Sequence, residues 1–275
     1  LTIYPEPSLS NSSTAQVCSG TALNIVLTSP VPSNYSWSAT DNLNTTGETL
    51  TPKQTGVIND VLMNQTAGPE IVKYTIILTS QAGACINLKP QTIDVTVFPE
   101  PSITNSSTAQ VCSGTALNIS LTSTVASTYS WIAMNNPNTN GETYTAPKQT
   151  DVINDVLINT SSVAEIVKYT VMVTSNITGC SSIKPQTIDV TVFPEPAITN
   201  STTAQVCSGT ALNISLTSTV ASTYSWMATN NPNTNGETYT APKQTDVIND
   251  VLINTTSAAE IVKYTVTLTS KTGGC

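Results

Sequence analysis

The sequence predicts an all-β protein in which tandem β-sandwich domains are arranged as an extended rod. Three observations lead to this prediction. The chain repeats itself with a period of about 95 residues, each repeat holds a series of short strand-like segments, and proline-bounded junctions separate the repeats.

The repeat is visible in the spacing of the cysteines and of the longer segments around them. The segment from Phe98 to Trp131 returns almost unchanged from Phe193 to Trp226, and an earlier copy runs from Tyr4 to Trp37. Solenoid units are usually roughly 20–50 residues long, so this longer period indicates separate domains. Cysteines mark the period: Cys18, Cys112 and Cys207 are 94 and 95 residues apart, and Cys85, Cys180 and Cys275 are 95 apart.

The repeat predicts the domain boundaries. Residues 1–4 align with the end of a preceding repeat, residues 5–98 form repeat 1, residues 99–193 form repeat 2, and residues 194–275 form repeat 3 without its final strand. We interpret the sequence as a window taken from a longer array of repeats.

Strands are predicted from the pattern of apolar residues, with repeat 2 as the example. In Ala116–Ser123, Leu117, Ile119 and Leu121 alternate with small polar residues, which is typical of a strand with one wet face. Val152–Asn159 also fits a helical turn, but its β-branched residues and short length favour a strand. The other expected strands lie near Ser102–Ser107 and at Thr128–Ala133, Val167–Ser175 and Gln186–Phe193. About seven strands per repeat indicate an Ig-like sandwich with Greek-key connections.

Two aromatic positions in each repeat are predicted to be structural core. A tryptophan lies within the strand after Ala116–Ser123 and its counterparts, where a sandwich buries a large ring, and a tyrosine opens the penultimate strand, where a tyrosine corner would lie. A ligand platform is the alternative to core packing. The residues are Trp37, Trp131, Trp226, Tyr74, Tyr169 and Tyr264.

Short stiff segments join the predicted domains. Pro5-Glu6-Pro7, Pro99-Glu100-Pro101 and Pro194-Glu195-Pro196 occupy equivalent positions. Proline restricts the backbone on both sides, so these links favour a linear rod over a set of freely swivelling domains.

Composition excludes several classes of function. Only 9% of the residues are charged, the net charge is −8 and there is no histidine. The chain therefore cannot build the basic surface that a nucleic-acid partner needs, nor a histidine-ligated metal site or histidine general base. No apolar run approaches the ~20 residues of a membrane-spanning helix. We expect no enzymatic activity, catalytic residue, metal site or cofactor in this segment.

Two polar patterns have a functional alternative that we weigh against a structural one. Asn136, Asn138, Asn140 and Gly141 are spaced like the first half of a calcium loop, but a plain turn is favoured because the loop offers few carboxylates. Aspartates and glutamates recur at Asp60, Asp155, Asp250, Glu70, Glu165 and Glu260, and we interpret them as solvated surface charge with Lys73, Lys168 and Lys263 as partners.

The six cysteines predict disulfides, because two per repeat at fixed spacing in a chain of secreted character form a disulfide pattern. The favoured pairing is intradomain: Cys18–Cys85, Cys112–Cys180 and Cys207–Cys275. In a Greek-key trace the two cysteines of a repeat lie at opposite poles, and this leaves a second register open. That register joins neighbouring domains through Cys18–Cys180 and Cys112–Cys275.

The residues also resemble a known family. The strings YSWIAMNNPNTNGE (129–142), INDVLINTSSVAEIVKYTV (153–171) and IDVTVFPEP (188–196) are similar to the PKD-like repeats of very large Bacteroidota surface proteins. This resemblance covers essentially the whole chain. It implies an Ig-like (PKD-like) sandwich, secretion by the type IX route, and display on a bacterial cell surface in adhesins or gliding-motility filaments.

The function predicted from these observations is a non-catalytic, disulfide-reinforced stalk in a secreted cell-surface adhesin or extracellular filament. Its expected partners are neighbouring repeats of the same long chain, surface polysaccharide or other cells, and laterally associated copies, with no nucleic acid and no membrane insertion. Alternatives are multivalent glycan- or protein-binding modules that use apical loops, or an accessory region of a larger secreted enzyme. The loops around Asn136 and Asn231 are identical in sequence, which argues against distinct specificities.

Overall fold

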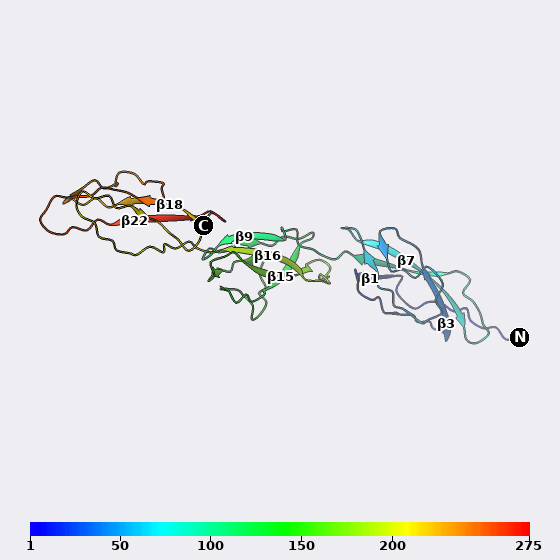
Figure 1. The fold of residues 1–275 in the computed structure, drawn as a ribbon. Coiled ribbons are helices and arrows are strands. Elements are labelled where there is room, and N and C mark those ends of the chain that lie inside the picture. The colour runs from blue at the N-terminus through cyan, green and yellow to red at the C-terminus, as the bar shows by residue number, and fades with distance from the viewer.

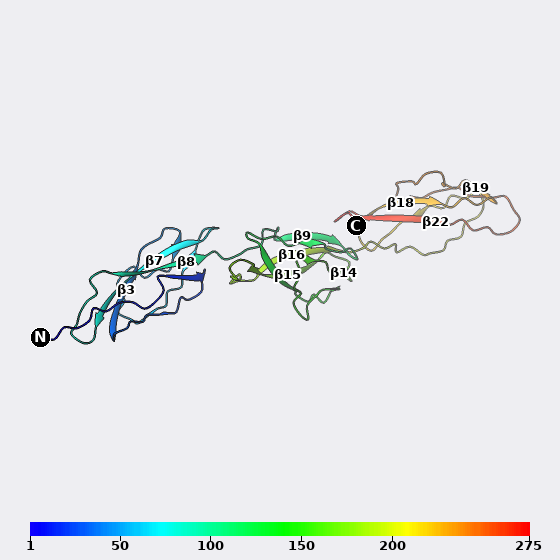
Figure 2. The ribbon, with the colours of Figure 1, turned by 180° about the vertical axis from the view of Figure 1, so that it is seen from behind.

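A computed structural model describes residues 1–275 and contains strands but no helix. Three β domains lie end to end and form an elongated molecule, with the chain running from one end towards the other (Figure 1). The view from behind shows the same order of domains (Figure 2). The predicted all-β class and rod-like arrangement are confirmed. No helix is long and apolar enough to cross a bilayer.

Each of the first two repeats holds eight strands. In repeat 1 they are β1 (Thr14–Cys18), β2 (Ile25–Val26), β3 (Ser33–Ala39), β4 (Thr45–Thr46), β5 (Val57–Ile58), β6 (Met63–Asn64), β7 (Glu70–Ser80) and β8 (Gln91–Phe98). In repeat 2 they are β9 (Thr108–Cys112), β10 (Ile119–Ser120), β11 (Ser127–Ala133), β12 (Thr139–Asn140), β13 (Val152–Ile153), β14 (Ile158–Asn159), β15 (Glu165–Ser175) and β16 (Gln186–Phe193).

One four-stranded sheet dominates each complete repeat. Its order is β1-β8-β7-β3 in repeat 1 and β9-β16-β15-β11 in repeat 2. The first strand pairs with the last in parallel, so that Cys18 lies beside Phe98 and Cys112 beside Phe193. The opposite layer consists of short pairs, β2 with β5 and β4 with β6, and of isolated bridges. This arrangement is an Ig-like sandwich.

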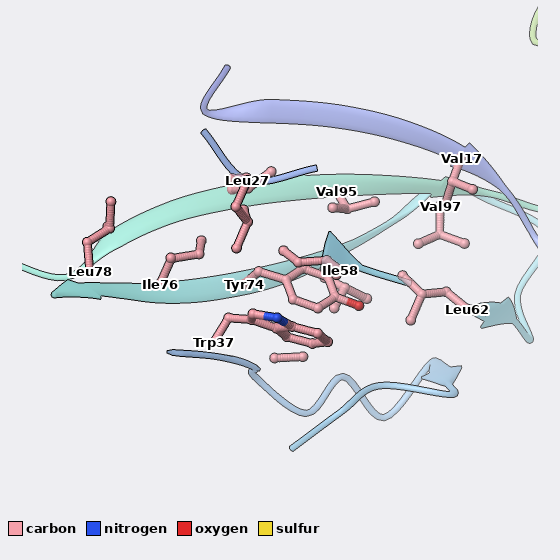
Figure 3. Packing of buried hydrophobic residues seen from close by; sticks show 13 residues of the cluster. Val17, Leu27, Trp37, Ile58, Leu62, Tyr74, Ile76, Leu78, Val95 and Val97 are labelled. Atoms are coloured by element: carbon pink, nitrogen blue, oxygen red, sulfur yellow. The ribbon is translucent and has the colours of Figure 1, made fainter. Parts of the chain in front are cut away.

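The core lies between these layers and follows the alternation of the long strands. Along β7, Val72, Tyr74, Ile76 and Leu78 are fully buried while the residues between them face outward. The ring of Trp37 meets that of Tyr74 edge to face, with centroids 5.8 Å apart, and the same pair recurs in the other repeats. Figure 3 shows these two rings among the apolar side chains of repeat 1.

Repeat 3 is built on the same plan but holds fewer strands. They are β17 (Ile214–Ser215), β18 (Ser222–Ala228), β19 (Thr234–Asn235), β20 (Val247–Ile248), β21 (Ile253–Asn254) and β22 (Tyr264–Ser270). Its main sheet has only β18 and β22, and no strand covers the far edge of β22. The buried apolar cluster accordingly has 3 residues, against 13 and 12 in repeats 1 and 2.

Some strand boundaries differ from the sequence-based expectation. The predicted strands Val167–Ser175 and Gln186–Phe193 are present as β15 and β16, whereas Ala116–Ser123 pairs as a ladder only over β10. Val152–Asn159 splits into β13 and β14. The Ser102–Ser107 segment contributes a single bridge from Ile103, and the adjoining strand β9 was not predicted.

Candidate functional site: the clamped junctions

Two disulfides join consecutive repeats. Cys18 of repeat 1 bonds to Cys180 of repeat 2, and Cys112 of repeat 2 bonds to Cys275 of repeat 3. The Cα atoms are 5.5 Å apart in both, within the range of ordinary disulfides. Cys85 and Cys207 are unpaired in this chain. The prediction of intradomain disulfides is therefore wrong for the favoured pairs Cys18–Cys85, Cys112–Cys180 and Cys207–Cys275. The alternative pairing, between neighbouring domains, is the one present.

The topology explains why a repeat cannot close on itself. Cys18 ends β1 beside Phe98, at the pole where β7 begins and β8 ends. Cys85 lies in the hairpin after β7, where its carbonyl accepts a hydrogen bond from the Ser80 amide. The 11 residues of β7 separate these poles by about 36 Å. The second cysteine of repeats 2 and 3 instead lies beside the first cysteine of the repeat before it.

An apolar contact and a tight hydrogen bond accompany the first clamp. The backbone of Ile183, in repeat 2, donates to the Glu100 carboxylate of the Pro-Glu-Pro segment at 2.6 Å. The Ile183 side chain lies against Gly20 of repeat 1, so closely that a Cβ at Gly20 would overlap it, and the Met63 sulfur lies beside the same glycine. The junction is thus held by the backbone, by a disulfide and by side-chain packing.

A shallow hollow of about 430 Å³ lies at the second junction. It is lined by small and apolar residues from both repeats, among them Val163, Phe193, Pro194, Val220 and Thr272. It holds no carboxylate or lysine, so it offers no chemistry beyond surface contact.

Inside each repeat, one recurring carboxylate is buried. Asp155 is 5% exposed; Tyr169 donates its hydroxyl proton to it at 2.9 Å, and Thr143 donates through both its backbone N–H and its hydroxyl. Lys148 lies 3.2 Å from the same carboxylate and 5.1 Å from the centre of the Trp131 ring. The interpretation of Asp60, Asp155 and Asp250 as solvated charge is therefore wrong.

These contacts shift the pKa values of the tyrosine in repeat 2 and of the aspartate in repeat 3. Burial first, and then the negative charge and hydrogen bond of Asp155, raise the pKa of Tyr169 far above its ordinary value. Burial alone raises the pKa of Asp250, but donors from Thr238, Tyr264 and Lys243 together bring it below its ordinary value. In repeat 3 the cluster is thus an ionised Asp250 carboxylate with neutral and cationic donors around it. The tyrosine contacts this side chain rather than backbone, so it is not a tyrosine corner.

The predicted surface lysines have other partners. Lys73 reaches Asp94 on the neighbouring strand at 2.6 Å, and Lys168 reaches Asp189 in the same way. Both pairs are about 40–50% exposed and lie across β7–β8 and β15–β16. They are cross-strand surface pairs, not partners of the buried aspartates or of Glu70 and Glu165.

The asparagine loops are turns whose side-chain amides donate hydrogen bonds to the glutamate that opens the long strand of the same repeat. The side-chain amides of Asn136 and Asn138 donate to Glu165 at 3.3 and 3.0 Å. Hydrogen bonds from Asn136 and Ser161 lower the pKa of that carboxylate. Asn136 also accepts the backbone N–H of Asn138 at 2.9 Å. The amides present N–H groups to the glutamate, which is the arrangement of a satisfied turn rather than of a set of calcium ligands.

The fold and the junctions define a class: tandem β-sandwich repeats whose neighbours are covalently clamped. A model of the PKD-like domain matches residues 15–101, 109–196 and 204–275. The chain therefore belongs to the PKD-like domain family, with three copies of the domain, as the resemblance implied.

Solved structures with a similar run of domains come from other proteins. The I67–I69 I-band fragment of titin is 11% identical, with a TM-score of 0.35 over 98% of this chain and 95% of that chain. Drosophila N-cadherin EC1-4 is 11% identical, with a TM-score of 0.28 over 95% of this chain and 74% of that chain. No curated protein sequence matches the chain.

Proposed function

We propose that this chain is a segment of a stalk in a secreted cell-surface adhesin or extracellular filament. In this role it holds a distal binding region away from the cell, for adhesion or for gliding motility. The observation that carries the proposal is the interdomain register of both disulfides. A clamp between repeats fixes how one domain sits on the next, which a stalk requires and an isolated binding module does not.

The junction resists bending because two covalent links cross it side by side. One is the backbone through Pro99-Glu100-Pro101, and the other is Cys18–Cys180. A single flexible link permits a hinge, whereas two separated links with Ile183 packed between the repeats restrict rotation about either one. The stalk is therefore expected to be stiff as well as long.

The clamps also limit how far tension can stretch the chain. With both disulfides intact, the shortest covalent path runs from Leu1 to Cys18, across to Cys180, back to Cys112 and across to Cys275. That path holds 17 residue steps before Cys18 and 68 between Cys180 and Cys112, so it extends to about 300 Å. The reduced chain of 275 residues extends to about 950 Å.

The disulfides also bear on where the protein is located. Disulfides persist in oxidising compartments, which supports an extracellular setting. The resemblance to bacterial surface repeats supports display on a bacterial cell surface after type IX secretion. The repeats hold no clustered set of metal ligands, and the proposed role needs neither metal nor catalysis.

Force spectroscopy with handles at residues 1 and 275 tests this proposal. We expect the oxidised chain to reach a limiting length of about 300 Å, and the reduced chain about 950 Å. The matched control Cys85→Ser/Cys207→Ser leaves both clamps in place and should behave like the oxidised parent. An oxidised chain that stretches to the reduced length would show that the clamps carry no load, and the stalk proposal would fail.

A further inference from the structure

We propose that each oxidised repeat carries tension along two adjacent chain segments, and that the stalk therefore survives a cut in the rest of the repeat. In repeat 2 these segments are residues 99–112 and 180–193, which we call the load ribbon. The inference rests on the proposed stalk function and adds to it which residues bear the load and which can be cut.

The two segments of the load ribbon enter repeat 2 together and leave it together. At the entrance, the backbone arrives at Pro99 and the disulfide from repeat 1 arrives at Cys180. At the exit, the backbone leaves from Phe193 and the disulfide to repeat 3 leaves from Cys112, its neighbour in the sheet. Each segment is therefore joined to one neighbouring repeat by a peptide bond and to the other by a disulfide.

Hydrogen bonds hold the two segments together from the entrance to the exit. Near the entrance, the backbone N–H of Ile183 donates to the Glu100 carboxylate at 2.6 Å. Further along, the backbone N–H of Ile103 donates to the side-chain oxygen of Gln186 at 2.7 Å. The parallel ladder of β9 with β16 follows and continues to the exit. Both strands run along the long axis of the molecule (Figure 1, Figure 2), so tension acts along the segments and loads their hydrogen bonds in shear.

Repeat 1 has the same ribbon in residues 5–18 and 85–98, where the Leu88 backbone donates to the Glu6 carboxylate at 2.6 Å. In both repeats the two segments are 14 residues long. A longer segment would stay slack while the shorter one became taut, so equal lengths let the two segments share the load.

Most of each repeat lies outside the load ribbon. Residues 113–179 of repeat 2 leave the ribbon after Cys112 and return to it at Cys180, so they form a side branch. This branch contains exposed loops around Tyr144 and Val163, which are 49% and 60% exposed. Exposed loop tips are the preferred sites of proteolytic cleavage, so cuts are expected where the tension does not pass.

The two disulfides also overlap along the sequence, which gives the chain spare covalent connections. One spans residues 18–180 and the other spans residues 112–275. Any single break in the backbone after Cys18 is therefore bridged by at least one disulfide. A second break is bridged as well if it falls in a different interval between the four bonded cysteines. One break in each of the three intervals divides the chain into two.

Force spectroscopy with one handle on Leu1 and another on Cys207 tests the load ribbon. In the Cys85→Ser variant Cys207 is the only free thiol, and the shortest covalent path to it from Leu1 crosses Cys18–Cys180. That path has 17 residue steps before Cys18 and 27 after Cys180. The oxidised chain should therefore stop lengthening at about 150 Å, and the reduced chain at about 720 Å.

Thrombin sites then separate a cut in the side branch from a cut in the ribbon. One variant has the site between Thr145 and Ala146, in a loop that is one residue shorter in repeat 1. Its matched control has the site between Ser201 and Thr202, in the segment of repeat 3 that corresponds to residues 99–112. After cleavage of the oxidised chain, the first variant should keep the limit of about 150 Å. The control should extend to about 540 Å, because tension must then cross the side branches.

Denaturing gels without reductant count the pieces that remain joined. The oxidised chain cut after Thr145 should run as one species, and a variant cut after Thr51, Thr145 and Thr240 should separate into two. A second side-branch variant, with the site after Ser162, controls for an insertion that disturbs folding. Both side-branch variants should begin to lengthen at a force within twofold of the uncut parent.

Two results would overturn the proposal. One is a chain cut after Thr145 that lengthens to the limit of the ribbon-cut control. The other is a fall of twofold or more in the force at which both side-branch variants begin to lengthen, since tension would then pass through the side branch. Neither result would alter the limiting length of the uncut chain, so the stalk proposal would stand.

Discussion

The buried carboxylate of Asp155 shows at the residue scale how each repeat tolerates a charge in its core. Removing an ion from water is costly unless hydrogen bonds and a counter-charge replace the water. Tyr169, Thr143 and Lys148 supply both, and no buried side-chain polar atom in the chain lacks a hydrogen-bond partner. The same set recurs in all three repeats and contacts both rings of the Trp–Tyr pair, because the tyrosine donates to the aspartate and the lysine lies over the tryptophan.

We predict that Asp155→Asn destabilises repeat 2 by about 1–3 kcal/mol, because hydrogen bonds to a charged group and the ion pair with Lys148 are lost. The matched control is Asp189→Asn, which removes a half-exposed pair with Lys168 and should cost less than about 1 kcal/mol. Hydrogen exchange of the β15 amides in the full chain measures both. Equal effects of the two substitutions would show that the buried cluster has no special role.

Acid should weaken repeat 3 through Asp250, whose pKa lies below its ordinary value in the fold. A carboxyl with a lowered folded pKa stabilises the protein above its unfolded pKa of about 3.9, and this stabilisation is lost as the pH falls through the folded value. The urea concentration at the unfolding midpoint of repeat 3, followed by Trp226 exchange or fluorescence, should therefore decrease as the pH is lowered below about 4. Asp250→Asn should flatten this dependence; an unchanged dependence would assign it to other groups.

The sequence predicted the aromatic core but misjudged these charges, for a physical reason. Trp131 and Tyr169 have large apolar rings within strand-like segments, so burial was the natural expectation, and both are fully buried. Asp155 lies 14 residues before Tyr169 and 7 after Lys148, and only the folded sandwich brings the three together. Nothing in the local pattern separates it from a surface acid.

At the scale of elements, the turn at Gly141 depends on the absence of a side chain. Its φ is +95°, and a Cβ there would overlap the carbonyl oxygen of Val156. Gly47 and Gly236 have the same geometry against Val61 and Val251. The turn is therefore packed directly on the backbone of Val156, which ties the β12 loop to the segment between β13 and β14 within the same layer.

We predict that Gly141→Ala destabilises repeat 2 by about 1–3 kcal/mol, through positive φ and the contact with Val156. Gly68→Ala is the matched control, since no atom lies within 4 Å of its Cβ position and its φ is not positive; its effect should stay within about 1 kcal/mol. Urea denaturation of the full chain compares them. A tolerated Gly141→Ala would mean that the turn can move away from the backbone of Val156.

Strand prediction succeeded where apolar residues alternate over a long run and failed where pairing is short. β15 and β16 follow the pattern of Val167–Ser175 and Gln186–Phe193 closely. β9 was missed because Thr108–Cys112 is mostly small and polar, and it is a strand only because β16 offers a parallel partner. Such pairing depends on the tertiary structure and leaves no local signal.

For the whole molecule, the strand that was not predicted fixes which disulfide pairing is possible. The parallel pairing of β9 with β16 carries Cys112 to the far pole of its repeat, beside Phe193. The sequence placed the two cysteines of a repeat at opposite poles of a Greek-key trace, but strand boundaries read from sequence are imprecise, and the intradomain pairing stayed the favoured one. In the structure, both disulfides link neighbouring repeats, and neither lies within a single repeat.

Peptide mapping of the oxidised chain without reduction tests the central claim, that neighbouring repeats are covalently clamped, most directly. Proteolysis and mass spectrometry should recover cross-linked peptides for Cys18–Cys180 and Cys112–Cys275, with Cys85 and Cys207 alkylated as free thiols in the monomer. Recovery of Cys18–Cys85 and Cys112–Cys180 instead would place each disulfide inside one repeat and would contradict the clamped stalk.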